Sequence, residues 1–188
     1  LTPRILYPDK GLAPADEANV GKALERLSGV ARGGATDLGG VFNVALKRLH
    51  GAPQPGVVYI GDGLPTVGEL EGGKLAGRVA RSMADSPARL FTIAVGASCN
   101  HALLERLARI GGGRALRVDL ARQAVQEALS FVGALKTPTI TELQLDVGAG
   151  LDQVFSTAAG KISRGQEVAL FARSHHPLPD TIEVSGRL

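Results

Sequence analysis

The chain has little cysteine, few aromatic residues and no long hydrophobic run. Its 188 residues include 1 cysteine, no tryptophan and 4% aromatic residues in all. The single cysteine, Cys99, excludes an internal disulfide and therefore a small disulfide-stapled scaffold. No apolar run approaches the roughly 18 residues of a membrane-spanning helix, so membrane insertion is not expected in this segment. The chain starts at Leu1 without a signal peptide, and we expect it to be a piece of a longer protein.

An excess of one charge is also lacking. The 21 basic residues exceed the 18 acidic ones by 3, and no aromatic residues are interleaved with the basic ones. This balance argues against nucleic acid as a partner. The apolar fraction of 44% and the charged fraction of 21% are ordinary for a globular protein and exclude a disordered chain. Heavy use of Ala, Gly, Arg and Leu is typical of a GC-rich bacterial genome.

Helical and strand patterns alternate through the first 136 residues. Apolar side chains recur at helical spacing over 16–28, 37–49, 74–84, 103–110 and 125–135. Apolar runs over 57–60, 90–95 and 115–118 predict buried strands, with the glycines at 111–113 ending the helix before the last of them. Such alternation predicts a Rossmann-like, doubly wound, mostly parallel sheet with helices on both faces.

The period changes after Lys136. Residues 139–147, 167–172 and 181–187 alternate apolar and polar side chains, and turn-forming residues separate them. We therefore predict two units: an α/β domain over residues 1–136 and a partial β-rich module of β-sandwich type over residues 137–188. The second unit is called the β-rich segment below.

An acidic residue directly follows the first apolar strand. The run from Val57 to Ile60 stops at Gly61-Asp62-Gly63. In open α/β sheets, ligands bind at the carboxyl ends of the strands, so Asp62 is a candidate site residue. The alternative interpretation is an Asp-Gly turn with no ligand.

A hydroxyl group lies on a second glycine-rich loop. The stretch Gly33 to Asp37 places Thr36 at the start of a helix, where either Thr36 or Asp37 can serve as the N-terminal cap. Hydroxyl and carboxylate oxygens are the donors that hard divalent cations prefer. Thr36 and Asp62 are therefore candidate metal ligands, with capping as the alternative role of Thr36.

These two loops resemble parts of a known family. Gly34-Ala35-Thr36-Asp37 and Gly61-Asp62-Gly63-Leu64-Pro65-Thr66 are similar to the second and third loops of the metal-ion-dependent adhesion site (MIDAS) of von Willebrand factor A (VWA) domains. In that family the second loop supplies a threonine and the third an aspartate. The family's first loop, Asp-x-Ser-x-Ser, has no match in the 188 residues.

The resemblance extends from about Arg4 to Leu135. Arg4 to Pro8 aligns with the family's third strand, so the first two strands and the first helix are missing and we expect an N-terminally truncated, incomplete VWA fold. The β-rich segment is similar to the one that follows the A domain in proteins that join a VIT domain to a VWA domain.

The resemblance implies a non-enzymatic adhesion or interaction module. Mg²⁺ or Mn²⁺, held by Thr36 and Asp62, would be presented to a carboxylate of a protein partner. Because the first loop is missing, we expect metal binding by this chain alone to be weak or absent. The missing N-terminal part of the same protein is a second expected partner, and the family resemblance favours the cell envelope or the exterior.

Two alternatives remain at this point. One is a VWA scaffold with a non-functional metal site. The other is an α/β hydrolase or nucleotide-binding domain that uses Asp62 as an acid, base or ligand. Gly68 to Leu75 follows the spacing of a phosphate-binding loop, but leucine replaces the required Ser or Thr. Cys99 and His101 lack a third group that would orient them for nucleophilic catalysis.

Overall fold

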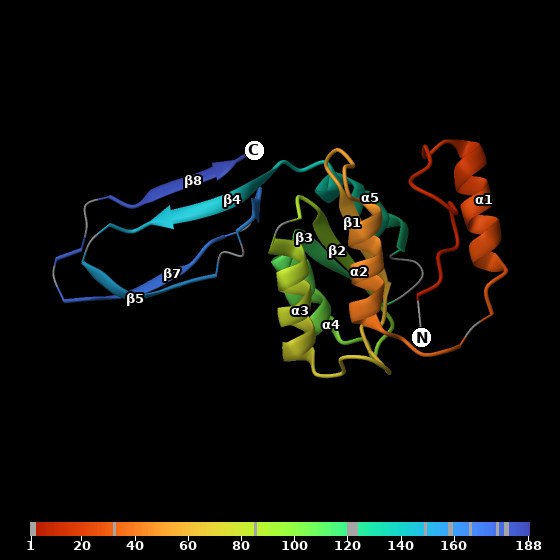
Figure 1. The fold of residues 1–188 in the computed structure, drawn as a ribbon, viewed down its shortest axis with the longest axis horizontal. Helices are drawn as coiled ribbons and strands as arrows, with labels where there is room; N and C mark the ends of the chain where they lie inside the picture. The colour runs from red at the N-terminus through yellow and green to blue at the C-terminus, as the bar shows by residue number, and fades with distance from the viewer. Residues whose placement is uncertain are drawn as a thin grey trace.

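The computed structural model describes residues 3–31, 33–84, 86–119, 124–148, 150–157, 160–165, 167–175, 177–178 and 181–188. An α/β body lies in the middle of the molecule, between the β-rich segment and helix α1 (Figure 1). The elements up to the β-rich segment are α1 (Glu17–Ser28), α2 (Leu38–Arg48), β1 (Gly56–Gly61), α3 (Gly72–Ala84), β2 (Arg89–Val95), α4 (His101–Ile110), β3 (Gly112–Val118) and α5 (Ala124–Leu135).

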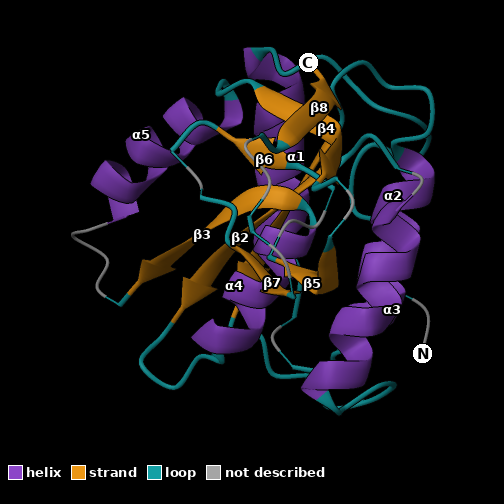
Figure 2. Cartoon of the chain, turned by 90° about the vertical axis from the view of Figure 1, so that its left-hand side faces the viewer, coloured by secondary structure: helices purple, strands orange, loops and turns teal. Residues whose placement is uncertain are grey.

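The body is built on a three-stranded parallel sheet in the order β1-β2-β3. In the register of β1 and β2, Val57 lies beside Leu90 and Ile60 beside Ile93. Figure 2 shows α4 and α5 on opposite sides of β2 and β3. The parallel strands with helices on both faces confirm the predicted Rossmann-like fold. Asp62 and Gly96 follow β1 and β2 and therefore lie at the same end of the sheet.

Alternate residues of β2 pack into two different cores. Leu90 and Ala94 belong to the main core, which lies under α2, α3 and α4. Phe91 belongs to a smaller cluster under α5, where its ring meets Phe131 edge to face at 5.5 Å. The main core consists of Leu38, Phe42, Val57, Leu75, Ala76, Val79, Met83, Ala88, Leu90, Ala94, Leu103, Leu104 and Leu107. Both faces of β2 are therefore buried, as the continuous apolar run predicts.

Strand β3 begins earlier than its sequence predicts. Its first residues are Gly112 and Gly113, which the sequence pattern assigned to the end of the preceding helix. A Cβ atom at position 113 would lie 2.1 Å from the carbonyl oxygen of Leu90. The glycines are therefore needed because β3 passes very close to β2, and they do more than end α4.

The segment before α2 lies apart from the sheet. The expected strand at Arg4 to Pro8 is not found: residues 3–8 belong to no strand, and β1 is the edge of the sheet in the described part of the chain. Arg48 of α2 holds this segment by donating to the carbonyls of Pro8 and Gly11. Within a sheet the backbone of an extended segment is paired with a neighbouring strand. Here the described hydrogen bonds to this segment's carbonyls come instead from the side chains of Arg26 and Arg48.

Helix α1 begins at the cap Asp16, whose side chain accepts a hydrogen bond from the amide of Asn19. Its apolar stripe is nevertheless uncovered, because none of its residues is buried. Val20, Leu24 and Leu27 are 44%, 60% and 59% exposed. On its own α1 gains little from packing, and most helical stability in proteins comes from a buried apolar face.

The β-rich segment contains only antiparallel pairs. Its strands are β4 (Thr139–Asp146), β5 (Leu151–Ser156), β6 (Ile162–Ser163), β7 (Leu170–Ser174) and β8 (Glu183–Arg187). Strand β4 lies between β6 and β8, while β5 pairs with β7. The sequence pattern locates β4 and β8, places β7 about three residues too early, and misses β5 and β6. No described side chain of this segment is fully buried.

Polar side chains tie the β-rich segment to the body. Arg89 of β2 donates to the carbonyls of Leu135 and Thr137 and to the hydroxyl of Thr139. Lys161 donates to the carbonyls of Ser86 and Ala88 at 2.6 and 2.8 Å. Burial lowers the pKa of both cations. Hydrogen bonds from the side chains of Arg89 and Lys161 therefore hold the junction between the α/β body and the β-rich segment.

Replacing Arg89 by methionine should loosen this connection. The change keeps an apolar stem but leaves the carbonyls of Leu135 and Thr137 without their donor. Because hydrogen bonds to charged groups contribute about 1.5–3 kcal/mol, we expect a loss of about 2 kcal/mol in the free energy of unfolding by urea. Cleavage between residues 135 and 139 in limited proteolysis should accelerate as well. Arg109→Met is the control, since the one side-chain partner of Arg109 among the described residues is Glu105, in an exposed pair, and its loss should change stability by less than about 0.5 kcal/mol. Equal effects of the two changes would contradict this interpretation.

Candidate functional site

Asp62 lies at the carboxyl end of β1 with its side chain exposed. Its Oδ1 accepts a hydrogen bond from the amide of Leu64 at 3.0 Å. Its main-chain carbonyl accepts a second one from the amide of Asn100, the cap of α4, at 2.7 Å. No cation of the described residues forms an ion pair with Asp62. The carboxylate is thus held in a turn and available to an external cation.

The two glycines that flank Asp62 meet neighbouring side chains. A Cβ atom at Gly61 would lie 2.5 Å from the hydroxyl oxygen of Tyr59, and one at Gly63 would lie 2.7 Å from Cγ of Leu104. Gly63 also has a φ of +71°, which favours glycine. Burial raises the pKa of Tyr59; the hydrogen bond from the Gly63 amide lowers it, and the charge of Asp62 raises it. The contacts of Gly61 with Tyr59 and of Gly63 with Leu104 therefore help to fix the shape of the Asp62 loop.

The loop that carries Thr36 is joined to the Asp62 loop. The carbonyl of Thr36 accepts hydrogen bonds from the amides of Thr66 and Val67 at 3.0 and 3.3 Å. The amide of Thr36 in turn donates to Oγ1 of Thr66 at 2.8 Å. In the described part of the chain no group is hydrogen-bonded to the Thr36 hydroxyl. The structure thus brings the two candidate loops together, side by side at one end of the sheet.

Asp37, and not Thr36, caps helix α2. The side chain of Asp37 accepts a hydrogen bond from the amide of Gly40 at 2.9 Å. Of the two cap residues that the sequence allowed, Asp37 is confirmed and Thr36 is wrong. A Cβ atom at Gly68 would lie 2.6 Å from Oδ1 of Asp37, so glycine at this position allows the chain that follows the Asp62 loop to approach the start of α2 closely.

A further carboxylate at this edge is already paired. Asp119 directly follows β3 and accepts a hydrogen bond from Nε of Arg117 at 2.8 Å. The hydrogen bond and charge of Asp119 raise the pKa of Arg117. Among the described residues, Asp119 therefore has a neighbouring cation that balances its charge, whereas Asp62 has none.

The donor oxygens fit part of a divalent-cation site. Thr36 and Asp62 supply the hydroxyl and carboxylate oxygens that Mg²⁺ and Mn²⁺ prefer, and both lie on joined loops. Such ions need about six oxygens in all. Within the residues that the structure describes, no group of three or more His, Cys, Asp or Glu side chains could hold a metal ion.

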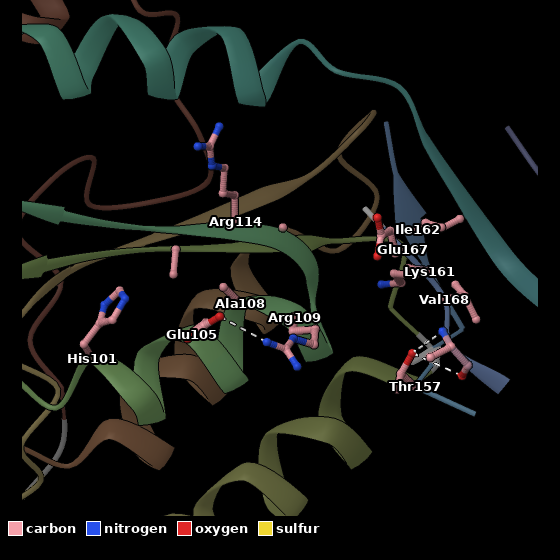
Figure 3. A pocket seen from close by; sticks show the side chains of 13 residues that line it. His101, Glu105, Ala108, Arg109, Arg114, Thr157, Lys161, Ile162, Glu167 and Val168 are labelled. Atoms are coloured by element: carbon pink, nitrogen blue, oxygen red, sulfur yellow. Dashed lines mark hydrogen bonds and ion pairs between the residues drawn. The ribbon is translucent and has the colours of Figure 1, made fainter. Parts of the chain in front are cut away.

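A cleft on another side of the body offers no comparable set of groups. It has a volume of about 530 Å³ and lies between α4, β3 and the β-rich segment (Figure 3). Its charged lining residues include Glu105, Arg109, Arg114, Lys161 and Glu167. Arg109 pairs with Glu105, and Lys161 is engaged by two carbonyls. Nδ1 of His101, also in the lining, is buried without a partner among the described atoms. The cleft gives no indication of a ligand class.

Sequence reasoning assigned no role to three residues that build the site, although it included Thr66 in the Asp62 loop. Tyr59, Thr66 and Asn100 form hydrogen bonds to the two candidate loops. Asn100 could have been found as a cap residue before an amphipathic helix. For Tyr59 and Thr66 no local signal exists, since their partners are known only from the fold.

Comparison with known proteins finds related curated chains. No family model matches the chain. Inter-alpha-trypsin inhibitor heavy chain H4 of Homo sapiens is 25% identical over 189 residues, which covers 94% of this chain and 20% of that protein. Heavy chain H2 of Sus scrofa is 24% identical over 144 residues, which covers 72% of this chain and 15% of that protein. The chain thus spans a fifth or less of the length of these curated relatives.

A solved structure shares the fold. The von Willebrand factor type A structure from Catenulispora acidiphila superposes with a TM-score of 0.68 at 16% identity, covering 97% of this chain and 43% of that chain. None of the helices described here is long and apolar enough to cross a membrane. The parallel sheet, the flanking helices and this superposition show that the chain has the fold of a von Willebrand factor type A domain.

Proposed function

We propose that the chain is a non-enzymatic protein-interaction module that works through a divalent cation at Thr36 and Asp62. The cation, Mg²⁺ or Mn²⁺, would leave one position open for a carboxylate of a protein partner. We place this activity at the cell envelope or outside the cell, as the family resemblance implies. The VWA fold supports a role in protein interaction in general.

The observation that carries the proposal is the joining of the two loops. Three hydrogen bonds between residues 36 and 66–67 hold the loops together. Asp62 is exposed and has no cationic partner in the described structure, whereas the nearby acid Asp119 is paired with Arg117. An exposed carboxylate without a cationic partner lies on a loop that is joined to the loop of a hydroxyl without a hydrogen bond in the described structure. A hard cation would complete such an arrangement.

The roles of the two side chains differ. The Asp62 carboxylate would provide negative charge and an oxygen ligand, while the Thr36 hydroxyl would provide a neutral oxygen. When bound, the cation would supply the positive charge that attracts a partner carboxylate. Because these two residues give only part of the roughly six oxygens required, the remaining ligands must come from other groups or water.

Asp62→Ala in the full-length protein is the test of this function. We expect Mg²⁺ affinity, measured by calorimetric titration, to fall by at least about tenfold, which corresponds to 1.4 kcal/mol. The fold should survive, because the Asp62 side chain is exposed. For the 188-residue chain alone we expect little binding.

Asp119→Ala is the matched control, since it removes a carboxylate from the same edge of the sheet that already has a partner. It should leave Mg²⁺ affinity nearly unchanged. Unchanged affinity in Asp62→Ala would refute the proposed site, and tight stoichiometric binding by the chain alone would refute the incomplete donor set. Chelator-resistant partner binding would favour the alternative, a VWA scaffold without a working metal site.

A further inference from the structure

We propose that Tyr59 is a positioning residue that fixes the Gly61-Asp62-Gly63 turn and so sets where the Asp62 carboxylate points. The expected effect on metal binding rests on the proposed function of Asp62, whereas the expected effect on the turn follows from the contacts of Tyr59.

The ring of Tyr59 is anchored in the main core. Tyr59 and Val57 lie on the same face of β1, the face covered by α2. The ring centroids of Tyr59 and Phe42 are 5.8 Å apart, with the ring planes tilted by 52°. A tyrosine whose ring is packed in this way has little freedom, so its hydroxyl oxygen occupies a defined place beyond the end of the strand.

The hydroxyl reaches the turn that carries Asp62. It accepts a hydrogen bond from the amide of Gly63 at 3.2 Å. It also fills the space that a Cβ atom at Gly61 would need. Asp62 lies between these two glycines, so the turn curves around the hydroxyl with the Asp62 side chain exposed.

Other contacts hold the same turn from the side of α4. Leu104 packs against Gly63, and the amide of Asn100 donates to the Asp62 carbonyl. Neither contact satisfies the amide of Gly63. Tyr59 therefore supplies the hydrogen bond that ties the turn to β1, whereas Asn100 ties it to α4.

Packing of the ring in the core does not by itself explain why residue 59 is a tyrosine, which carries a hydroxyl group. Phenylalanine would fill the core equally well and would avoid the cost of partly burying a polar group. Tyrosine in such a place needs a hydrogen-bond partner, and here the partner is the amide next to the proposed ligand.

Tyr59→Phe tests this role, with Tyr7→Phe as the matched control. Tyr7, the other tyrosine of the chain, donates to the side chain of Asn19 in the segment before α2. In Tyr59→Phe the amide of Gly63 should exchange with solvent about three- to tenfold faster in hydrogen-exchange measurements. The amide of Leu103, which donates to Asn100 Oδ1, should be unaffected. Tyr7→Phe should change neither amide.

The consequence for the metal is measured on the full-length protein with Mn²⁺ alone. Tyr59→Phe should weaken Mn²⁺ binding by about three- to tenfold, as the loss of about one net hydrogen bond would do. If Asp62→Ala abolishes binding but Tyr59→Phe leaves both the affinity and Gly63 exchange unchanged, the positioning role is refuted and the proposed function stands. If Asp62→Ala has no effect, the proposed function fails, while faster Gly63 exchange in Tyr59→Phe would still establish the structural role.

Discussion

Replacing Gly113 by alanine should destabilise the domain by about 3 kcal/mol or more, the upper range for overpacking a close-packed interior. A Cβ atom at this position would lie 2.1 Å from the carbonyl oxygen of Leu90 and 2.7 Å from its carbonyl carbon. Both are backbone atoms, so no side-chain rotation can relieve the contact. Urea denaturation should show the loss directly.

The cost is large because the contact lies where two strands pair. Gly113 falls at a register shift between β2 and β3, where Leu90 pairs with Gly112 and Thr92 with Ala115. Moving the backbone there would disturb the pairing on both sides of the shift. With typical stabilities of about 5–15 kcal/mol, such a loss would leave a marginal domain.

Gly133→Ala is the matched control. Gly133 lies in α5, and a Cβ atom there would meet nothing within 4 Å. Alanine is about 1 kcal/mol more favourable than glycine inside a helix, so this variant should be as stable as the parent or somewhat more so. Similar midpoints for the two variants would show that the close approach at Gly113 is not needed.

The sequence was most informative where apolar patterns are continuous. The runs that became β1 and β2 could be identified because their side chains fill cores on one or both faces of a parallel sheet. The site residues Asp62 and Thr36 were predicted from local motifs, and the structure places their loops together. Whether they bind a cation remains the proposal tested by Asp62→Ala.

Other features depend on contacts between distant segments and left no local signal. The glycines 112–113 looked like a helix end, because the pairing of β3 with Leu90 is invisible in sequence. Strand β5 has mostly exposed side chains, so its sequence shows little alternation. Strand β6 has only two residues, which is too short for any alternation to appear. Arg4 to Pro8 looked like a strand by resemblance, but no neighbouring strand pairs with it in the structure.

The second prediction with a large expected effect is that the chain self-associates through the exposed edge of strand β1. On the face away from the main core, Val58 is 39% and Ile60 65% exposed, and β1 pairs only with β2 among the described strands. Val125 and Leu129 of α5 add further exposed apolar surface, at 72% and 70%. An open edge beside an apolar face tends to recruit another strand or another molecule.

We therefore expect the 188-residue chain to self-associate with rising concentration, and Ile60→Lys to weaken this association by at least about tenfold, as 1.4 kcal/mol would. A lysine on an edge strand opposes pairing, and its ammonium can remain in water. Because Ile60 is 65% exposed, the folding free energy of the chain should change by less than about 0.5 kcal/mol. Leu70→Lys, at a loop position that is 58% exposed, is the control and should associate like the parent in sedimentation equilibrium. If Ile60→Lys associates as strongly as Leu70→Lys, the β1 edge is not the associating surface. In the full-length protein the same substitution distinguishes a free edge from a covered one, since a strand that covers β1 would make Ile60→Lys destabilising there while it stays neutral in the chain alone.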